Sequence, residues 1–387
     1  MHLKYRNVNE AFRDLVEMFC NRTFSRVGGP DTVATSSRNG PVLYIQEPVT
    51  ITYTHPRERV LFNEARDANP FFHLYESLWM LVGRNDVAPL QYYVSTIDQF
   101  SDDGVTFNGA YGWRWRHSRP GDGRYTMSNM TDQLKLIIEH LKAKPNSRRA
   151  VLHMSNVEDD LLKMDTTKDQ CCNLVVTFLI REEGHCGYCY DGEPSERNPH
   201  DPDSAGCKTK HLDMTVFNRS NDMIWGMLGA NVVHFSMLQE YMAACIGVEV
   251  GHYHQITNNL HVYEWNFKPE EWLDPTDDFD YRTAEFGEYL VTSNWKPFPL
   301  VQDPATFDRE VVEFVERHSE DALTANYKEP FLQKVAQPVC GAYHHYKRKN
   351  YGFALLVADT IASDDWRIAC VNWLKRRMEK RHAKASD

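Results

Sequence analysis

The stretch 169–178, DQCCNLVVTF, sets two adjacent cysteines at the start of an apolar run that is rich in β-branched residues. A run of this kind is typical of a buried β-strand. Because neighbouring side chains of a strand point to opposite faces, Cys171 and Cys172 cannot serve one site as equals. Either one thiol does chemistry while the other packs, or both are small buried hydrophobes.

Segments on either side of this strand carry helical and strand patterns of their own. Residues 8–20 have apolar side chains at helical spacing, and 70–83 is apolar on almost every side, which predicts a buried helix. We expect further helices over 130–145, 231–247 and 363–387, and strands over 41–54, 147–157, 171–181 and 211–222.

Composition and charge limit the classes of function. The 387 residues are enough for one large core or two modest domains. A net charge of −11 argues against a general nucleic-acid surface, but it allows a local basic pocket for a small phosphate. The chain shows neither the apolar run of a membrane span nor the apolar core of a signal peptide. The nine scattered cysteines therefore predict reduced thiols in a cytoplasmic protein without a membrane partner.

Several polar residues interrupt otherwise apolar elements. Arginines, a thiol, a carboxylate and an amide together suit covalent catalysis on a small phosphorylated substrate. Taken singly, each is better explained as locally satisfied structure, and only their order and spacing along the chain favour a functional site. They are Glu76, Arg148, Arg149, Cys172, Arg219, Ser220 and Asn231, with His261 and Tyr263 on one face of a strand.

This ordered set resembles the thymidylate synthase superfamily over residues 36–265. It contains SRR (147–149), a cysteine that heads an apolar strand, RSND (219–222), an asparagine and LHVY (260–263). RSND, LHVY and YGWRW (111–115) are most similar to the phage-type pyrimidine hydroxymethylases, whose reaction takes place in the host cytoplasm. The resemblance implies an α+β fold in which a large mixed β-sheet is covered by helices and dimerises through the sheet. It also implies a catalytic core over 1–300 and a mostly helical extension over 301–387.

The resemblance assigns a role to each matched residue. Cys172 matches the nucleophile, and Cys171 matches the residue before it, a proline in the synthases. Glu76 matches the glutamate that organises water and protons, Tyr111 an active-site tyrosine, and Asn231 the residue that reads the pyrimidine edge.

The remaining matches bind the two substrates. An arginine pair in this family reaches the phosphate bound by the partner subunit, so we expect a homodimer. The matches are Arg38, Arg219 and Ser220 for the phosphate, Arg148 and Arg149 for the phosphate across the dimer, His261 and Tyr263 for the sugar 3′-hydroxyl, and Asp222 for the folate pterin.

The expected chemistry is one-carbon transfer to a pyrimidine deoxynucleoside monophosphate. Carbon 5 of a pyrimidine is a poor nucleophile. A thiolate that adds to carbon 6 turns carbon 5 into an enolate-like centre, and nearby arginines favour the thiolate. The resemblance implies 5,10-methylenetetrahydrofolate as the one-carbon donor.

The chain departs from the synthases at several positions. Asn173 replaces a histidine, Thr177 a glutamine, and Ile97 an aromatic residue that shields the methylene intermediate. The segment WGMLGAN (225–231) is one residue longer than its counterpart, and the chain continues past the closing tail of the synthases. A lost shield and an altered tail both favour water over hydride at the intermediate. We therefore expect a dUMP hydroxymethylase in which Asn231 selects uracil.

Four alternatives remain open. A thymidylate synthase would release dihydrofolate, and a dCMP hydroxymethylase would carry an aspartate where Asn231 stands. A non-catalytic relative that binds nucleotide or RNA is a third, although the negative charge and the retained Cys172 weigh against it. The fourth is a zinc-binding interaction module on an inert core.

The polar segment 184–210 is too long for an ordinary hairpin loop. Cys186, Cys189, Cys207 and His211 in and after it are zinc-ligand types at suitable spacing. A zinc ion would hold a hairpin that cannot build its own core. The alternative is a flexible surface loop with incidental cysteines.

Overall fold

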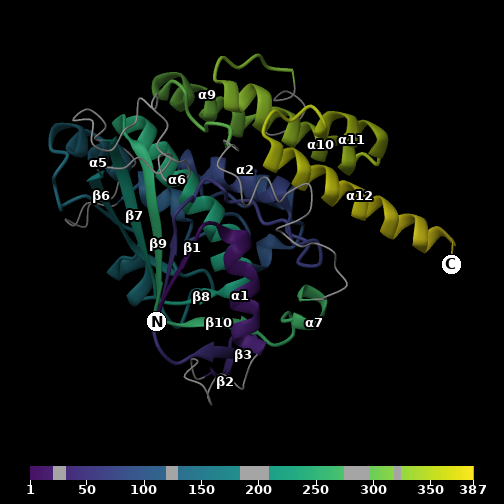
Figure 1. The fold of residues 1–387 in the computed structure, drawn as a ribbon, viewed down its shortest axis with the longest axis horizontal. Helices are drawn as coiled ribbons and strands as arrows, with labels where there is room; N and C mark the ends of the chain where they lie inside the picture. Colours follow the sequence, from purple (N-terminus) through teal and green to yellow (C-terminus); the bar gives the residue numbers. More distant parts are fainter. Residues whose placement is uncertain (21–31, 119–129, 184–208, 274–296, 318–323, 387) are drawn as a thin grey trace, which may run out of the picture.

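A computed structural model describes residues 1–20, 32–118, 130–183, 209–273, 297–317 and 324–386 (Figure 1). Its centre is a six-stranded sheet with the strand order β1-β4-β9-β7-β6-β5. The pairs β1–β4 and β9–β7 are parallel and the other neighbours are antiparallel. The predicted α+β fold with a large mixed sheet is therefore confirmed. The strands are β1 (His2–Tyr5), β4 (Val49–Tyr53), β5 (Val151–His153), β6 (Asn173–Glu183), β7 (Thr209–Asn218) and β9 (Glu249–Thr257).

A second, four-stranded sheet has the order β2-β3-β10-β8. Its strands are β2 (Thr32–Ser37), β3 (Gly40–Ile45), β8 (Asn221–Asp222) and β10 (Leu260–Tyr263). The turn between β2 and β3 contains Arg38, and β8 pairs in parallel with β10 so that Asp222 lies beside His261. This small sheet thus gathers several of the predicted substrate ligands.

The helix α6 (Asn231–Ile246) lies at the centre of the molecule, between the large sheet and α2 (Pro70–Leu81) (Figure 1). It packs on β7 and β9 and is buried on nearly every side. The helix ends where the sequence predicts, because Gly247 follows it in a left-handed conformation with φ 89°. Its first residue, Asn231, therefore has a fixed place next to the sheet.

The helix α2 carries Glu76 and contacts α6 on one side and α4 (Tyr111–Arg116) on another. Asn69 caps α2 by accepting a hydrogen bond from the backbone N–H of Phe72. At Gly112 the backbones of α4 and α2 approach closely, since a Cβ there would lie 2.1 Å from the carbonyl oxygen of Met80. Glycine is thus needed for the packing that brings Tyr111 and Glu76 onto adjacent helices.

Helices near the C-terminus pack on the opposite side of α2 (Figure 1). The phenol rings of Tyr75 and Tyr93 stack with centroids 4.7 Å apart, and Tyr93 stacks on Tyr343 at 4.8 Å. The Tyr75 hydroxyl donates to the carbonyl of Val315 over 3.1 Å. The division of the chain at residue 300 remains a prediction.

The other elements follow the predicted pattern with shifted ends. The helices predicted over 8–20, 130–145 and 363–387 are α1, α5 and α12, whereas the strand predicted over 147–157 is reduced to β5 because arginines and polar residues flank it. Among the described residues, no helix combines the length and the apolar character that crossing a membrane requires. The helices not yet bounded are α1 (Val8–Cys20), α3 (Ala88–Gln91), α5 (Gln133–Ala143), α7 (Pro269–Trp272), α9 (Pro304–Glu316), α10 (Gln337–Lys347), α11 (Tyr351–Ala358) and α12 (Asp364–Ser386), with a 3₁₀ turn at Ile97–Phe100 and π-helical segments at Val157–Leu161, Met223–Ala230 and Leu332–Ala336.

We predict that Gly112→Ala destabilises the fold by about 2–4 kcal/mol, because the added methyl group overlaps the backbone of α2. Thermal or urea unfolding measures the change. Gly352→Ala is the matched control, since a Cβ at that position of α11 meets no atom within 4 Å. The control should be neutral or stabilising by up to about 1 kcal/mol. Equal effects of the two substitutions would contradict the close contact of α4 with α2.

Candidate active site

The thiol of Cys172 lies where β6 begins, beside the end of β7. The backbone N–H of Arg219 donates to the carbonyl of Cys172 over 2.9 Å. Its guanidinium donates through Nε to the carbonyl of Cys171 over 3.1 Å and through Nη2 to that of Gln170 over 3.4 Å. These bonds fix the guanidinium against the backbone that carries the thiol.

Two opposing effects act on the pKa of the Cys172 thiol. Burial raises it, and the positive charges of Arg219 and Arg38 oppose that rise. Arg38 reaches this region from the small sheet, where its Nη1 donates to the carbonyl of Lys168 over 2.6 Å. A bound phosphate would share these two guanidinium groups, and the thiolate would form next to them.

Cys171 has a different environment from its neighbour. It is 2% exposed, and its Sγ donates to the carbonyl of Asn173 over 2.9 Å. Burial raises the pKa of this thiol far above its ordinary value. Cys172 is only partly buried. The two cysteines therefore occupy different environments, as strand alternation predicts.

Tyr111 and Asp169 complete this side of the site. Burial raises the pKa of the Tyr111 phenol, and electrostatic interaction with Cys172 and Cys171 adds to the rise. The carboxylate of Asp169 accepts from the backbone N–H of Gly109 over 2.8 Å, and burial raises its pKa to about 6. This bond ties the turn before α4 to the cysteine segment.

The predicted sugar ligands, His261 and Tyr263, lie on β10 of the small sheet. The hydroxyl of Ser220 is 3.4 Å from Nδ1 of His261, whose ring makes an edge contact with Tyr263 at 5.3 Å. The amide of Asn39, next to Arg38, donates to the hydroxyl of Tyr263 over 3.4 Å. Contacts thus connect Ser220, His261 and Tyr263 to the turn that carries Arg38.

Asn231 begins α6 directly after the segment that contains the additional residue. The segment Met223–Ala230 is π-helical, and Gly229 within it has the non-helical angles φ −115° and ψ −111°. A π-helical turn is wider than an α-helical turn, so it takes up one extra residue. Nδ2 of Asn231 donates to Oδ1 of Asn221 over 3.0 Å.

Glu76 has a partner that the sequence did not reveal. Nε2 of His234 lies 2.9 Å from Oε2 of Glu76, and the His234 side chain is 3% exposed. A second histidine, His73, stays neutral because burial, followed by the charges of His234 and Arg66, lowers its pKa to about 3. The pair of Glu76 and His234 is suited to moving a proton to or from water.

Asp222 caps the π-helical segment by accepting from the backbone N–H of Trp225 over 2.5 Å. Burial raises its pKa to about 6, opposed by that N–H group and by the charge of Arg66. The rings of Trp225 and Trp265 stand edge to face at 5.2 Å, and both are substantially exposed. This is the kind of surface on which an aromatic ring system can stack.

Some predicted residues lie elsewhere. Arg148 and Arg149 are exposed before β5, and neither forms an ion pair within the part of the chain that the structure describes. Of the predicted zinc ligands, Cys186, Cys189 and Cys207 lie outside the described residues, and only His211, on β7, is described. That zinc site remains a prediction.

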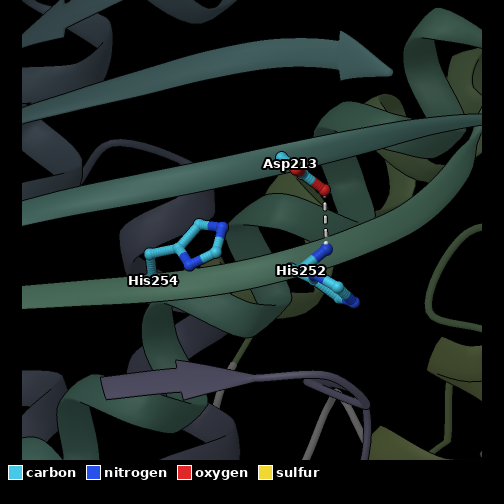
Figure 2. A group of neighbouring side chains, drawn as sticks. All are labelled: Asp213, His252 and His254. Atoms are coloured by element: carbon cyan, nitrogen blue, oxygen red, sulfur yellow. Dashed lines mark hydrogen bonds between the residues drawn. The ribbon is translucent and has the colours of Figure 1, made fainter. Parts of the chain in front are cut away.

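Figure 2 shows a different group of metal-ligand residues, Asp213, His252 and His254, on two strands of the large sheet. Tyr253 contacts Phe235 of α6, so His252 and His254 on either side of it point to the opposite face. Ligand atoms of Asp213, His252 and His254 are all within 4.8 Å of one another. However, the carboxylate of Asp213 already accepts from Nε of Arg181 over 2.6 Å and from the His252 N–H over 2.8 Å. We assign no metal to this group, and it is not part of the site.

Comparison with known proteins is consistent with this geometry. Residues 66–280, more than half of the chain, match the model of the family described as thymidylate synthase. The chain belongs to the thymidylate synthase family. It is 38% identical to a deoxyuridylate hydroxymethyltransferase of Pseudomonas phage M6 across 100% of this chain and 97% of the relative. It is 40% identical to an enzyme of the same name from Bacillus phage SP01 across 67% of this chain and 69% of that protein. A third relative of this name, from Delftia phage PhiW-14, is 26% identical across 59% of this chain.

Sequence reasoning gave no role to several residues at or behind the site: Asp169, His234, Asn221 and Gln255. His234 follows Asn231 by one helical turn, so a buried histidine at that spacing was the available signal. Asn221 lies inside the quoted RSND motif without a role of its own, and Gln255 on β9 gave no signal beyond a polar residue in an alternating strand.

We predict that Cys172→Ser abolishes turnover, because a hydroxyl beside Arg219 does not supply a thiolate. Cys171→Ala should keep most of the activity, since that thiol only packs and donates one hydrogen bond. Product formation and formation of a covalent complex with nucleotide measure the two effects. Loss of activity in Cys171→Ala with an active Cys172→Ser enzyme would show that the roles are exchanged.

Proposed function

We propose that this protein is a dUMP hydroxymethylase. It would transfer the one-carbon unit of 5,10-methylenetetrahydrofolate to carbon 5 of dUMP with addition of water, and release 5-hydroxymethyl-dUMP and tetrahydrofolate. The observation that carries the proposal is the Cys172 thiol beside the fixed Arg219 guanidinium. The carboxylate–histidine pair of Glu76 and His234 and the hydrogen-bonded amide of Asn231 support it. Relatives named deoxyuridylate hydroxymethyltransferase support the substrate and the product.

The first half of the reaction uses the phosphate row and the thiol. Arg219, Arg38 and Ser220 would bind the phosphate, and His261 with Tyr263 would hold the sugar. These contacts place carbon 6 over Sγ of Cys172, which attacks as the thiolate. Carbon 5 then attacks the methylene group that the folate supplies.

In the second half, loss of the carbon 5 proton and departure of tetrahydrofolate leave an exocyclic methylene group. Water adds to this methylene carbon and gives one proton to a general base of the protein. The electron pair of the exocyclic double bond then forms the 5,6 double bond, which expels the Cys172 thiolate from carbon 6. The Glu76–His234 pair is the candidate base, since its atoms lie 2.9 Å apart in a buried place. Ile97 at the start of a 3₁₀ turn offers no aromatic shield against water.

The relatives are phage proteins, so the same proposal places the reaction in the cytoplasm of an infected host cell. A thymidylate synthase activity is the second candidate, because the fold and the nucleophile are common to both reactions. The identity of the folate product distinguishes them.

We predict that incubation with dUMP and methylenetetrahydrofolate yields a nucleotide heavier by one CH₂O unit, measured by mass spectrometry, without the absorbance rise of dihydrofolate. A gain of one CH₂ unit with dihydrofolate would establish a thymidylate synthase instead. No product from dUMP but a hydroxymethylated dCMP would reassign the base. Binding of dUMP without any turnover would favour a non-catalytic relative.

We also propose a homodimer formed through the large sheet. On the face turned away from α6, Val175, Phe217 and Ile256 form an apolar row across three neighbouring strands and are only partly buried. Stacking of two such faces would bury this row. In this arrangement the exposed Arg148 and Arg149 would contact the substrate phosphate bound by the second subunit.

For this dimer we predict complementation between two inactive variants, Arg149→Ala and Cys172→Ala. After mixing, unfolding and refolding, a mixed dimer has one site with both groups, so activity should return to about a quarter of wild type by statistical pairing. Each variant refolded alone is the control. A fully active monomer in light scattering, or no activity in the mixture, would contradict the shared site.

A further inference from the structure

A row of amide side chains runs from Asn231 into the core. Nδ2 of Asn231 donates to Oδ1 of Asn221 over 3.0 Å, and Nδ2 of Asn221 donates to Oε1 of Gln255 over 3.3 Å. Nε2 of Gln255 then donates to the backbone carbonyl of Met227 over 3.2 Å. Asn221 is 4% exposed and Gln255 is 0% exposed, so water cannot replace these bonds.

The last bond gives the whole row a direction. A backbone carbonyl only accepts hydrogen bonds, so Gln255 must point its NH₂ group at Met227 and its oxygen at Asn221. Asn221 must in turn present its NH₂ group to Gln255 and its oxygen to Asn231. Asn231 can satisfy that oxygen only with its own NH₂ group.

We propose that Asn221 and Gln255 are positioning residues that fix the amide of Asn231 in the orientation that reads uracil and rejects cytosine. This inference rests on the proposed function, because it concerns the nucleotide bound in that site. With its direction fixed, Asn231 presents its oxygen and its second N–H to the base. The oxygen accepts from N3–H of uracil and the N–H donates to the oxygen on carbon 4.

Cytosine requires the opposite arrangement, with an acceptor facing its amino group and a donor facing N3. Turning the Asn231 amide around would set its oxygen against Oδ1 of Asn221. Relief by turning Asn221 and then Gln255 would end with Oε1 of Gln255 against the carbonyl of Met227. An amide that is free to turn can pair with uracil or with cytosine, whereas the anchored row restricts Asn231 to the orientation that pairs with uracil.

The local backbone is built around the row. A Cβ at Gly226 would lie 2.2 Å from Oδ1 of Asn221 and 3.1 Å from Nδ2 of Asn231, so only glycine leaves room for both amides. Met227, which supplies the final acceptor, belongs to the same π-helical segment that takes up the additional residue. The extra residue and the anchored row are therefore parts of one local arrangement.

The test compares kcat/KM for dUMP and dCMP in wild type and in Gln255→Leu. Loss of the anchor lets Asn221 and Asn231 turn together, so the ratio of the two values should fall by roughly tenfold. The preference for dUMP over dCMP in binding, measured as the ratio of their Kd values by calorimetry without folate, should also fall. Gln255→Glu should keep the preference, because a buried carboxylic acid stays neutral, donates to Met227 and accepts from Asn221.

Gln239→Leu is the matched control, since it removes an equally buried glutamine whose Nε2 donates to the carbonyls of Leu212, Gly251 and His252. It should lower Tm without changing the preference between bases. If Gln255→Leu does not fold, Asn221→Ser interrupts the same row and carries the same expectation.

A folded Gln255→Leu enzyme, or its Asn221→Ser substitute, that keeps the wild-type ratio would overturn the role of the row. The same holds if Gln239→Leu changes the ratio as much as Gln255→Leu. Absence of hydroxymethylated product from dUMP in the wild-type enzyme would instead overturn the proposed function, so the two failures are distinguishable.

Discussion

The bonds from Arg219 to the cysteine segment are the interaction on which the site depends. One guanidinium and one backbone N–H bind three successive carbonyls, those of Gln170, Cys171 and Cys172. They join the end of β7 to the start of β6, so the thiol and a fixed positive charge move together. A thiolate in a buried place is costly without such a charge, and in the proposed reaction a phosphate bound by the same arginine would bring its sugar and base into register with the sulfur.

Two buried polar side chains of α6 bind groups on other elements. Gln239 on α6 binds three carbonyls of β7 and β9, and Glu240 on the same helix pairs with Arg57 and Arg59. Their partners lie on separate elements, so they bind the second half of α6 to the sheet and to the segment before α2, about two helical turns from Asn231. Asn231 and His234 lie in the first turn of the same helix, where Asn221 and Glu76 contact them.

Local patterns in the sequence predicted most helices and strands, and the resemblance to the family supplied the fold, whereas the roles given to the site residues stay predictions. Strand alternation separated the two cysteines, and Gly247 marked the end of α6. His234 and Gln255 escaped because their roles come from contacts with Glu76 and Asn221, which are distant along the chain and leave no periodic signal. The sequence also revealed the extra residue before Asn231, but only the wider π-helical turn shows how the backbone takes it up.

The tyrosine stack joins α2 to the C-terminal helices. Tyr75 lies one residue before Glu76, and it is held by Tyr93 and, through Tyr93, by Tyr343 of the C-terminal helices. Local opening of these helices would expose one side of α2, so the free energy that protects the C-terminal helices from hydrogen exchange also protects the helix that carries Glu76. Heat or denaturant that loosens the end of the chain would therefore disturb the site before the large sheet is lost.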